Sequence, residues 1–248
     1  METLETKEFN LASGDLNESF SELTAKEIHL WRVSLNPSQE VLLSCQNALS
    51  TAEKGRVEFF SFDQVKQNYL VSQGVLRILL GKYLGITPQE VELGRHSKGK
   101  PFCKQDPNLY FNISNSGGKC VYAFSRKGEI GIDLEKIRPL SDLDEMIEKN
   151  FSAQEQSYIQ KKSAEKLRRF FLFWTIKESY LKAIGEGMRI EPQNLEFTVQ
   201  NQQIKLIGIK GYTDFEDWNF KEVPFDKTYI RTLTYLGDSV EFQDFEII

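Results

Sequence analysis

Gly-Ile-Asp-Leu-Glu at residues 131–135 and Trp-Thr-Ile-Lys-Glu-Ser-Tyr-Leu-Lys at residues 174–182 are the stretches that decide the fold and the chemistry of this chain. In the first stretch apolar and acidic residues alternate, which is typical of a strand. Asp133 and Glu135 would then lie on one face of the strand, roughly 6–7 Å apart.

The second stretch indicates a helix that carries charged groups on an apolar body. Trp174, Glu178 and Lys182 are spaced one turn apart along one side. Three acids and a lysine on two elements predict a site for a hard cation and a phosphate.

Each half of this pattern also has an ordinary explanation. Two acids on a strand are common on a solvent-facing surface, and a glutamate four residues before a lysine is a common surface pair that contributes about 0.2–0.5 kcal/mol. However, the helix is apolar over most of its circumference, which predicts burial, and buried charges need partners. Two carboxylates at this spacing repel by about 2–3 kcal/mol at an effective dielectric near 20, and a bound divalent ion would remove that repulsion.

Composition narrows the classes of protein. The chain has 248 residues, of which 40% are hydrophobic, enough for one large domain or two small ones. A net charge of −5 argues against a dedicated nucleic-acid binder. No apolar run is long enough to span a bilayer and no signal-peptide pattern is present, so a cytoplasmic protein is expected. The three cysteines lack metal-ligand spacing and are expected to be reduced, and two histidines argue against a zinc site or a His-based triad.

A faint internal repeat appears when the chain is compared with itself at an offset of about 100 residues. Residues 28–35 align with 130–137, and the helix ending near residue 85 aligns with the one ending near residue 185. The acids of the later copy have apolar counterparts in the earlier copy, so one site is expected, at the seam between the copies. Residues 1–26 are polar and are expected to form a flexible tail.

Periodicity and turn residues predict the other elements. Strands are expected at 28–35, 109–114, 120–126 and 129–137, with short strands between 194 and 248. Helices are expected at 38–60, 64–84, 141–149, 152–162 and 165–184.

Three further motifs have two readings each. The loop 94–101 has the spacing of a phosphate-binding loop, but Pro101 replaces the magnesium-binding Ser or Thr, so that interpretation is rejected, although Lys98 and Lys100 can still meet a phosphate. Residues 112–117 end a strand in small polar groups that either hold an anion or form a simple turn. A basic cluster is either a solvated face or a dock for an acidic partner: Lys161, Lys162, Lys166, Arg168 and Arg169.

Several motifs occur together in an order typical of one family. The chain resembles the 4′-phosphopantetheinyl transferases, in particular the larger monomeric group typified by the surfactin-synthetase activator, from about residue 28 to at least 200. The motifs are Lys-Gly-Lys-Pro (98–101), Phe-Asn-Ile-Ser (111–114), Gly-Ile-Asp-Leu-Glu-Lys (131–136), Phe-Ser-x-x-Glu (151–155) and Trp-x-x-Lys-Glu-Ser-x-x-Lys-x-x-Gly (174–185).

The resemblance implies an α+β fold of two similar α+β halves, related by a pseudo-twofold axis, with the active site between them. The halves would be residues 27–128 and residues 129–248, and the second would carry the metal site. The implied reaction transfers the 4′-phosphopantetheine arm of coenzyme A to a serine of an apo carrier protein and releases 3′,5′-ADP.

The resemblance also implies roles for the acids and the lysine. Asp133, Glu135 and Glu178 would hold Mg²⁺, with Mn²⁺ as an alternative, against the pyrophosphate of coenzyme A. Glu178 would accept the serine proton, directly or through water, and Lys182 would stabilise or protonate the departing phosphate. Glu155 would assist the metal or the nucleophile.

Binding of coenzyme A would involve residues from both halves. By the resemblance, Lys100, Ser114 and Asn115 would contact phosphate groups of the nucleotide, and Lys54 and Arg56 would approach the 3′-phosphate. Asn115 departs from the family, which commonly has a histidine there, so the charge that an imidazole can carry is lost.

The expected partners are coenzyme A and an apo acyl or peptidyl carrier protein of a fatty-acid, polyketide or nonribosomal-peptide system. Neither nucleic acid nor a membrane is expected, and the protein is expected to be a monomer. The alternative is a non-catalytic coenzyme A-binding regulator of carrier-protein systems, motivated by Asn115 and by Asn68, which stands where the family often has an arginine.

Overall fold

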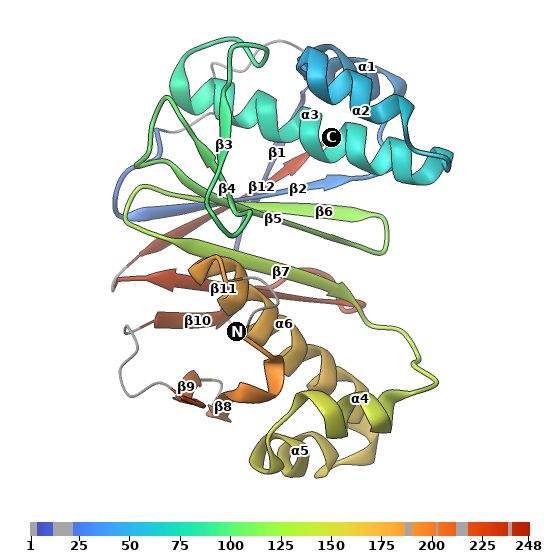
Figure 1. The fold of residues 1–248 in the computed structure, drawn as a ribbon, viewed down its shortest axis with the longest axis vertical. Helices are drawn as coiled ribbons and strands as arrows, with labels where there is room; N and C mark the ends of the chain where they lie inside the picture. The colour runs from blue at the N-terminus through green and yellow to red at the C-terminus, as the bar shows by residue number, and fades with distance from the viewer. Residues whose placement is uncertain (1–3, 12–21, 187–189, 202, 212–217, 238–239) are drawn as a thin grey trace.

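Helices cover the two outer faces of a pair of stacked β-sheets, so that the layers follow the order helix, sheet, sheet, helix (Figure 1). The structure, a computed structural model, describes residues 4–11, 22–186, 190–201, 203–211, 218–237 and 240–248. The predicted α+β class is confirmed.

Along the chain, the strands are interrupted by two groups of helices, α1–α3 and α4–α6. The strands are β1 (Thr6–Phe9), β2 (Glu27–Ser34), β3 (Leu93–Arg95), β4 (Pro101–Cys103), β5 (Tyr110–Ser116), β6 (Lys119–Ser125), β7 (Ile130–Lys136), β8 (Leu195–Gln200), β9 (Gln203–Ile209), β10 (Trp218–Glu222), β11 (Tyr229–Leu236) and β12 (Glu241–Ile247). The helices are α1 (Gln39–Ala48), α2 (Thr51–Glu58), α3 (Asp63–Leu84), α4 (Leu143–Asn150), α5 (Ala153–Gln160) and α6 (Lys166–Ile184), with 3₁₀ turns at Ser163–Glu165 and Pro192–Asn194.

Two five-stranded sheets carry the fold. The first has the order β1-β12-β2-β6-β5, in which β12 runs parallel to both of its neighbours, and the second has the order β7-β11-β10-β9-β8 with antiparallel pairing. Strands β3 and β4 form a separate hairpin that contains the loop 94–101. That loop leads into a strand and not into a helix, as the rejection of a phosphate-binding loop requires.

The layers are held together by three apolar clusters. Leu79 of α3 packs in the cluster that contains Trp31, between the first helical layer and the first sheet. Leu30 and Ile132 belong to the cluster between the two sheets, and Ile230 to the cluster beneath α6. Because side chains alternate along a strand, β7 contributes one face to the intersheet core and offers its other face to α6.

The internal repeat is reproduced in the structure. The order β2-β6-β5 in the first sheet matches β7-β11-β10 in the second. Helices α2 and α5 both begin with a capping box, formed by Ser50 with Glu53 and by Ser152 with Glu155. Helices α3 and α6 both end at a glycine in the left-handed conformation.

The same capping glutamates form equivalent ion pairs with the long helix of each half. Glu53 pairs with Arg77 of α3, and Glu155 pairs with Lys177 of α6. Lys177 is 1% exposed, and its Nζ also donates to the carbonyl oxygens of three residues. These pairs fix the rotation of each long helix about its own axis.

Two expectations are corrected by the first sheet. The polar tail is wrong for Thr6–Phe9, which form β1, because Phe9 is buried edge-on against Trp31 at 5.2 Å between ring centroids. Residues 1–3 and 12–21 lie outside the described part of the chain.

Strand β12 joins the sheet of the first half, so the boundary at residue 128 does not separate the two sheets, and the limits of the halves stay a prediction. The helix expected at 38–60 is divided into α1 and α2 by the cap at Ser50.

Replacing Lys177 by Met should lower the free energy of unfolding by about 3–5 kcal/mol, because Glu155 would keep a buried charge without its partner. Urea denaturation would measure the loss. The matched control is Lys162→Met, since Lys162 pairs with Glu165 on an exposed surface and its loss should cost less than about 1 kcal/mol. Equal losses in the two variants would contradict the structural role assigned to Lys177.

Candidate active site

The two sheets meet along β5 and β7, and side chains of β5 join them. Three alternate residues of β5 each accept a hydrogen bond from a backbone N–H of β7. The bonds join Asn112 Oδ1 to Ile132 at 3.0 Å, Ser114 Oγ to Leu134 at 3.3 Å and Ser116 Oγ to Lys136 at 3.2 Å. Because the partners advance together along the chain, the two strands run in the same direction.

These bonds give the polar residues of 112–117 a structural role. The sequence had predicted either an anion-binding site or a simple turn, not a connection between the two sheets. The small polar side chains satisfy N–H groups at an edge of the second sheet, which buried backbone groups require. The signal in the sequence was the spacing of Asn112, Ser114 and Ser116, since residues two apart on a strand lie on one face.

Helix α6 lies close against β7 because of a glycine in that strand. A Cβ added to Gly131 would lie 1.9 Å from the carbonyl oxygen of Ser179 and 2.6 Å from the backbone nitrogen of Ala183. Only glycine allows this approach. It brings the predicted acids of β7 close to Glu178 of α6, as the two motifs predicted.

Asp133 is the centre of a buried polar cluster. The Asp133 Oδ1 atom accepts hydrogen bonds from Ser114 Oγ at 2.8 Å and from Lys182 Nζ at 2.6 Å. Lys182 Nζ also donates to Ser114 Oγ at 2.9 Å and to the carbonyl oxygen of Ile132 at 3.3 Å. Asp133 is 5% exposed, and its Oδ2 atom is buried with no hydrogen-bond partner among the described residues.

Glu135 and Glu178 flank this cluster. Burial raises the pKa of Glu178, and the negative charges of Asp133 and Glu135 raise it further, whereas Lys182 lowers it. Burial also raises the pKa of Glu135, and Asp133 adds to this, while the hydroxyl of Ser116 opposes it by donating to Glu135 Oε2 at 2.7 Å. The three carboxyl groups therefore repel one another across a shared space.

The donor set suits a hard divalent cation, although the side chains are not gathered around one. Within the described ranges no group of three or more His, Cys, Asp and Glu side chains is placed to hold a metal ion. The Lys182 ammonium occupies the cation position beside Asp133 Oδ1. The unpartnered Oδ2 atom and the mutual repulsion of the acids both fit Mg²⁺, which prefers carboxylate oxygens.

Lys100 lies between the halves and already has partners. Its Nζ forms an ion pair with Glu129 and donates to the carbonyl oxygens of Ala183 at 2.6 Å and of Ile130 at 3.2 Å. Burial lowers the pKa of Lys100, and Glu129 opposes that shift. Lys100 also lines a small pocket of about 260 Å³ together with Pro101 and Tyr110.

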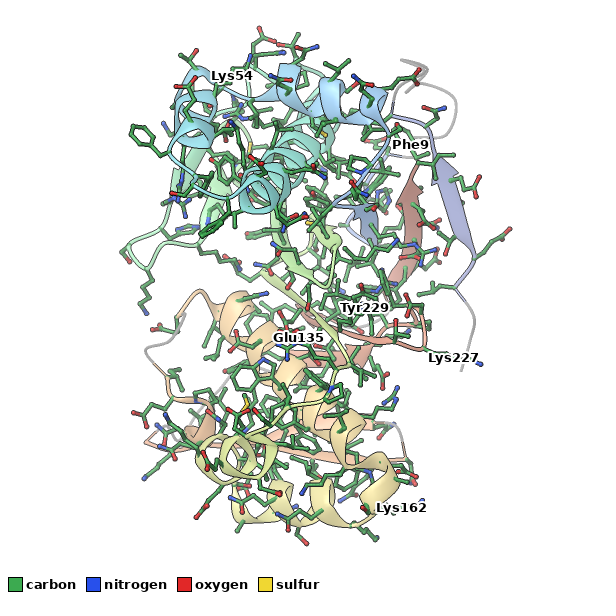
Figure 2. The ribbon with its side chains drawn as sticks, turned by 90° about the vertical axis from the view of Figure 1, so that its right-hand side faces the viewer. Phe9, Lys54, Glu135, Lys162, Lys227 and Tyr229 are labelled. Atoms are coloured by element: carbon green, nitrogen blue, oxygen red, sulfur yellow. The ribbon has the colours of Figure 1, made fainter. Side chains whose placement is uncertain are left out.

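The other residues predicted to bind coenzyme A are not gathered at Asp133. Asn115 is exposed and lies on the face of β5 opposite to Ser114. Arg56 places its guanidinium 5.4 Å from the ring centroid of Tyr69. Figure 2 shows Lys54 near the outer end of the first half, whereas Glu135 lies near the middle of the molecule.

The role expected for Glu155 is wrong. Its carboxylate is fully buried, accepts from Lys177 Nζ at 2.7 Å and accepts from the backbone N–H of Phe197 at 2.9 Å. Successive side chains are rotated by roughly 100° about the helix axis, so Lys177 and Glu178 lie on different faces of α6. Glu155 therefore anchors the helix from the side that does not carry the acids.

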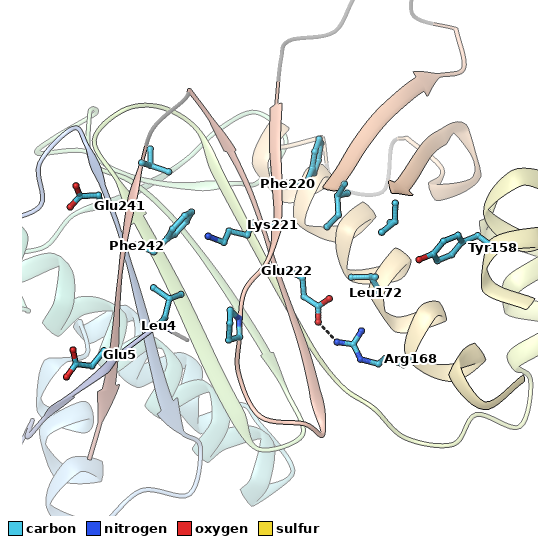
Figure 3. A pocket seen from close by; sticks show the side chains of 14 residues that line it. Leu4, Glu5, Tyr158, Arg168, Leu172, Phe220, Lys221, Glu222, Glu241 and Phe242 are labelled. Carbon is cyan, nitrogen blue, oxygen red and sulfur yellow. Dashed lines mark hydrogen bonds and ion pairs between the residues drawn. The ribbon is translucent and has the colours of Figure 1, made fainter. Parts of the chain in front are cut away.

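A larger pocket lies elsewhere. It has a volume of about 880 Å³ and is lined by residues of β10, β12 and α6 (Figure 3). Arg168 and Glu222 form an ion pair in its wall, and Lys221 Nζ lies 4.2 Å from the ring centroid of Phe242. Asp133, Glu135 and Glu178 are not among its lining residues, so the larger pocket is not the candidate active site.

Comparison with known proteins gives the family. The model of the 4′-phosphopantetheinyl transferase superfamily matches residues 129–244, and the model of the 4′-phosphopantetheinyl transferase N-terminal region matches residues 33–127. The 4′-phosphopantetheinyl transferase HetI of Nostoc sp. is 35% identical over 170 residues, which are 67% of this chain and 72% of that protein. This chain belongs to the 4′-phosphopantetheinyl transferase superfamily.

Two further similarities complete the comparison. The L-aminoadipate-semialdehyde dehydrogenase-phosphopantetheinyl transferase of Mus musculus is 29% identical over 210 residues, covering 77% of this chain and 68% of that protein. The holo-acyl-carrier-protein synthase of Thermotoga maritima superposes with a TM-score of 0.37 and 17% identity, over 43% of this chain and 61% of that chain. The enzyme class predicted from the motifs, a 4′-phosphopantetheinyl transferase, is confirmed by the family and the relatives.

In the part of the chain that the structure describes, no helix is both long enough and apolar enough to cross a bilayer.

Glu178→Gln should raise the free energy of unfolding at pH 7 by on the order of 1 kcal/mol, the size typical of stabilising changes at functional sites. The raised pKa of Glu178 means that its favourable contribution is complete below the ordinary glutamate pKa and is lost as the pH rises through the folded value. Glutamine stays neutral, so the gain should vanish at acidic pH.

Urea denaturation of wild type and variant across this pH range would measure the difference. The matched control is Glu148→Gln, an exposed position on α4 that should show no gain. A Glu178→Gln variant less stable than wild type at pH 7 would contradict the repulsion described above.

Proposed function

We propose that this 4′-phosphopantetheinyl transferase moves the phosphopantetheine arm of coenzyme A to a serine of an apo acyl or peptidyl carrier protein, in a Mg²⁺-dependent reaction at the seam between β7 and α6. The observation that supports this most is the cluster in which Lys182 bonds to Asp133 beside two further acids. One polypeptide supplies the whole cluster, which supports action as a monomer.

Asp133, Glu135 and Glu178 are the residues that would hold the metal. Asp133 has an oxygen without a hydrogen-bond partner among the described residues, and burial, together with the neighbouring acids, raises the pKa of each glutamate. When bound, Mg²⁺ or Mn²⁺ would neutralise the pyrophosphate of coenzyme A and the charge that develops on its leaving oxygen.

Glu178 is suited to take the proton of the attacking serine. Its pKa is raised by burial and by Asp133, which makes it a stronger base than an exposed glutamate. As the serine oxygen forms its bond to the β-phosphorus of coenzyme A, the bond from that phosphorus to the bridging oxygen breaks. The serine proton passes to Glu178, directly or through water.

Lys182 is suited to stabilise the leaving group of the same reaction. Its ammonium is held at 2.6 Å from Asp133 Oδ1 and 2.9 Å from Ser114 Oγ, and its side chain is 28% exposed. A short turn toward the seam would let it meet the departing 3′,5′-ADP phosphate and stabilise or protonate it. Ser114 would then be able to donate to a phosphate oxygen.

The remainder of coenzyme A is proposed to extend over the first half. Lys100 lies at the junction of the halves, and Lys54 and Arg56 lie on the exposed side of α2. These cations suit the phosphates of the nucleotide, with Asn115 as a neutral hydrogen-bonding group. Three buried free thiols support a reducing, cytoplasmic location.

Incubation of the wild-type protein with coenzyme A, Mg²⁺ and a panel of apo carrier proteins should add the mass of one phosphopantetheine group to at least one carrier. Glu178→Gln should lower kcat/KM about 10²–10⁴-fold, as expected for loss of a general base. Glu165→Gln, at a partly exposed position in the 3₁₀ turn before α6, is the control and should transfer normally. Absence of a mass gain with every carrier would refute the proposed reaction.

Chelation of divalent ions by EDTA should abolish transfer, and either Mg²⁺ or Mn²⁺ should restore it. Asp133→Asn should lower kcat/KM about 10²–10³-fold, comparable to the removal of one electrostatic group from a transition state. The mass of the carrier is the readout for both measurements. Transfer that continues at full rate in EDTA would show that the acids have another purpose.

A further inference from the structure

Among the buried polar side-chain atoms that lack a partner in the described part of the chain, two belong to residues on neighbouring strands. One is Oδ2 of Asp133 and the other is Oγ1 of Thr232; neither makes a hydrogen bond within the described part of the chain. Thr232 is 1% exposed and Asp133 is 5% exposed, so solvent does not supply the missing bonds. Such orphaned groups are uncommon and call for an explanation.

The strand register places these two atoms on the same side of the second sheet. Thr232 of β11 is the direct antiparallel partner of Asp133 of β7. Directly opposed residues point to the same face, with Cβ atoms about 4.5–5.5 Å apart. That face is the one covered by α6, because Thr234, two residues farther along β11, bonds to Ser179 of α6 at 2.8 Å.

A threonine at position 232 is unfavourable for folding alone. A buried hydroxyl without a partner costs free energy, and an apolar group of the same shape would avoid that cost. Valine is such a group. Thr234 shows that a hydroxyl under α6 can be satisfied, since its Oγ1 is paired with Ser179 Oγ.

The Thr232 hydroxyl can become a donor to Asp133 when the carboxylate loses its contact with Lys182. In the present arrangement Oδ1 holds both Lys182 and Ser114, and these two contacts fix the carboxylate. The proposed reaction draws Lys182 toward the departing phosphate, which leaves the carboxylate with fewer donors. Thr232 lies directly opposite Asp133 on β11, and its hydroxyl makes no other hydrogen bond among the described residues.

We propose that Thr232 is a positioning residue for transfer: its hydroxyl donates a hydrogen bond to Oδ2 of Asp133 once ligands bind, and so orients the carboxylate toward the cation. The inference rests on the proposed function of Asp133. A group that hydrogen-bonds a ligating carboxylate in this way typically changes metal affinity or activity by about 10–100-fold.

Three variants separate this role from a merely structural one. Thr232→Val keeps the shape and removes the hydroxyl, Thr232→Ser keeps the hydroxyl, and Thr234→Val removes an equally buried hydroxyl that is already paired. For each variant we would measure the melting temperature, the affinity for Mn²⁺ in the presence of coenzyme A by calorimetry, and kcat and KM for carrier modification.

Thr232→Val should melt at the wild-type temperature or about 2–4 °C above it, because no bond of the resting structure is lost. It should bind Mn²⁺ about 10–100-fold more weakly and show a reduced kcat. Thr232→Ser should restore Mn²⁺ affinity. Thr234→Val should melt lower than wild type while its Mn²⁺ affinity stays the same.

Two results would overturn the inference: Mn²⁺ affinity and kcat in Thr232→Val that match wild type, or a fall in melting temperature with the same functional profile as Thr234→Val. Failure of the proposed function is a separate result, because wild type itself would then transfer nothing to any carrier. The Mn²⁺ titration would still test whether Thr232 supports Asp133.

Discussion

The alternate hydrogen bonds from β5 side chains to β7 backbone N–H groups are the constraint on which the site depends. They join the two sheets without a backbone ladder, through Asn112, Ser114 and Ser116. Ser114 and Ser116 also donate to Asp133 and Glu135. The same hydroxyls that hold the halves together thus orient the acids, so the assembly of the fold and the placement of the site are one event.

Helix α6 supplies the other side of the site, and neighbouring residues divide its tasks. Lys177 is buried against Glu155 and holds the helix in one rotation, and Glu178 is then directed to the seam. Gly131 allows the helix to lie directly on β7. Acids that repel one another persist there because the surrounding packing over-determines their positions.

Much of this arrangement could be predicted from the sequence, because strong periodicity governs it. The alternation around Asp133 gave the correct face of β7, and the apolar circumference of α6 gave its burial. The features that could not be predicted depend on contacts between residues far apart in the sequence. Strand β1 is short and polar and exists because β12 pairs with it, and the burial of Glu155 depends on Lys177. Single-sequence patterns carry no information on such pairings.

Strand β12 has a consequence for how the protein is made. It lies between β1 and β2 and is paired with both, although almost the whole chain separates it from β1. The first sheet is therefore incomplete until residues 241–247 have left the ribosome, and Trp31 cannot stack on Phe245 before then. The first half therefore cannot mature before the second during synthesis, because its sheet is completed only by residues 241–247.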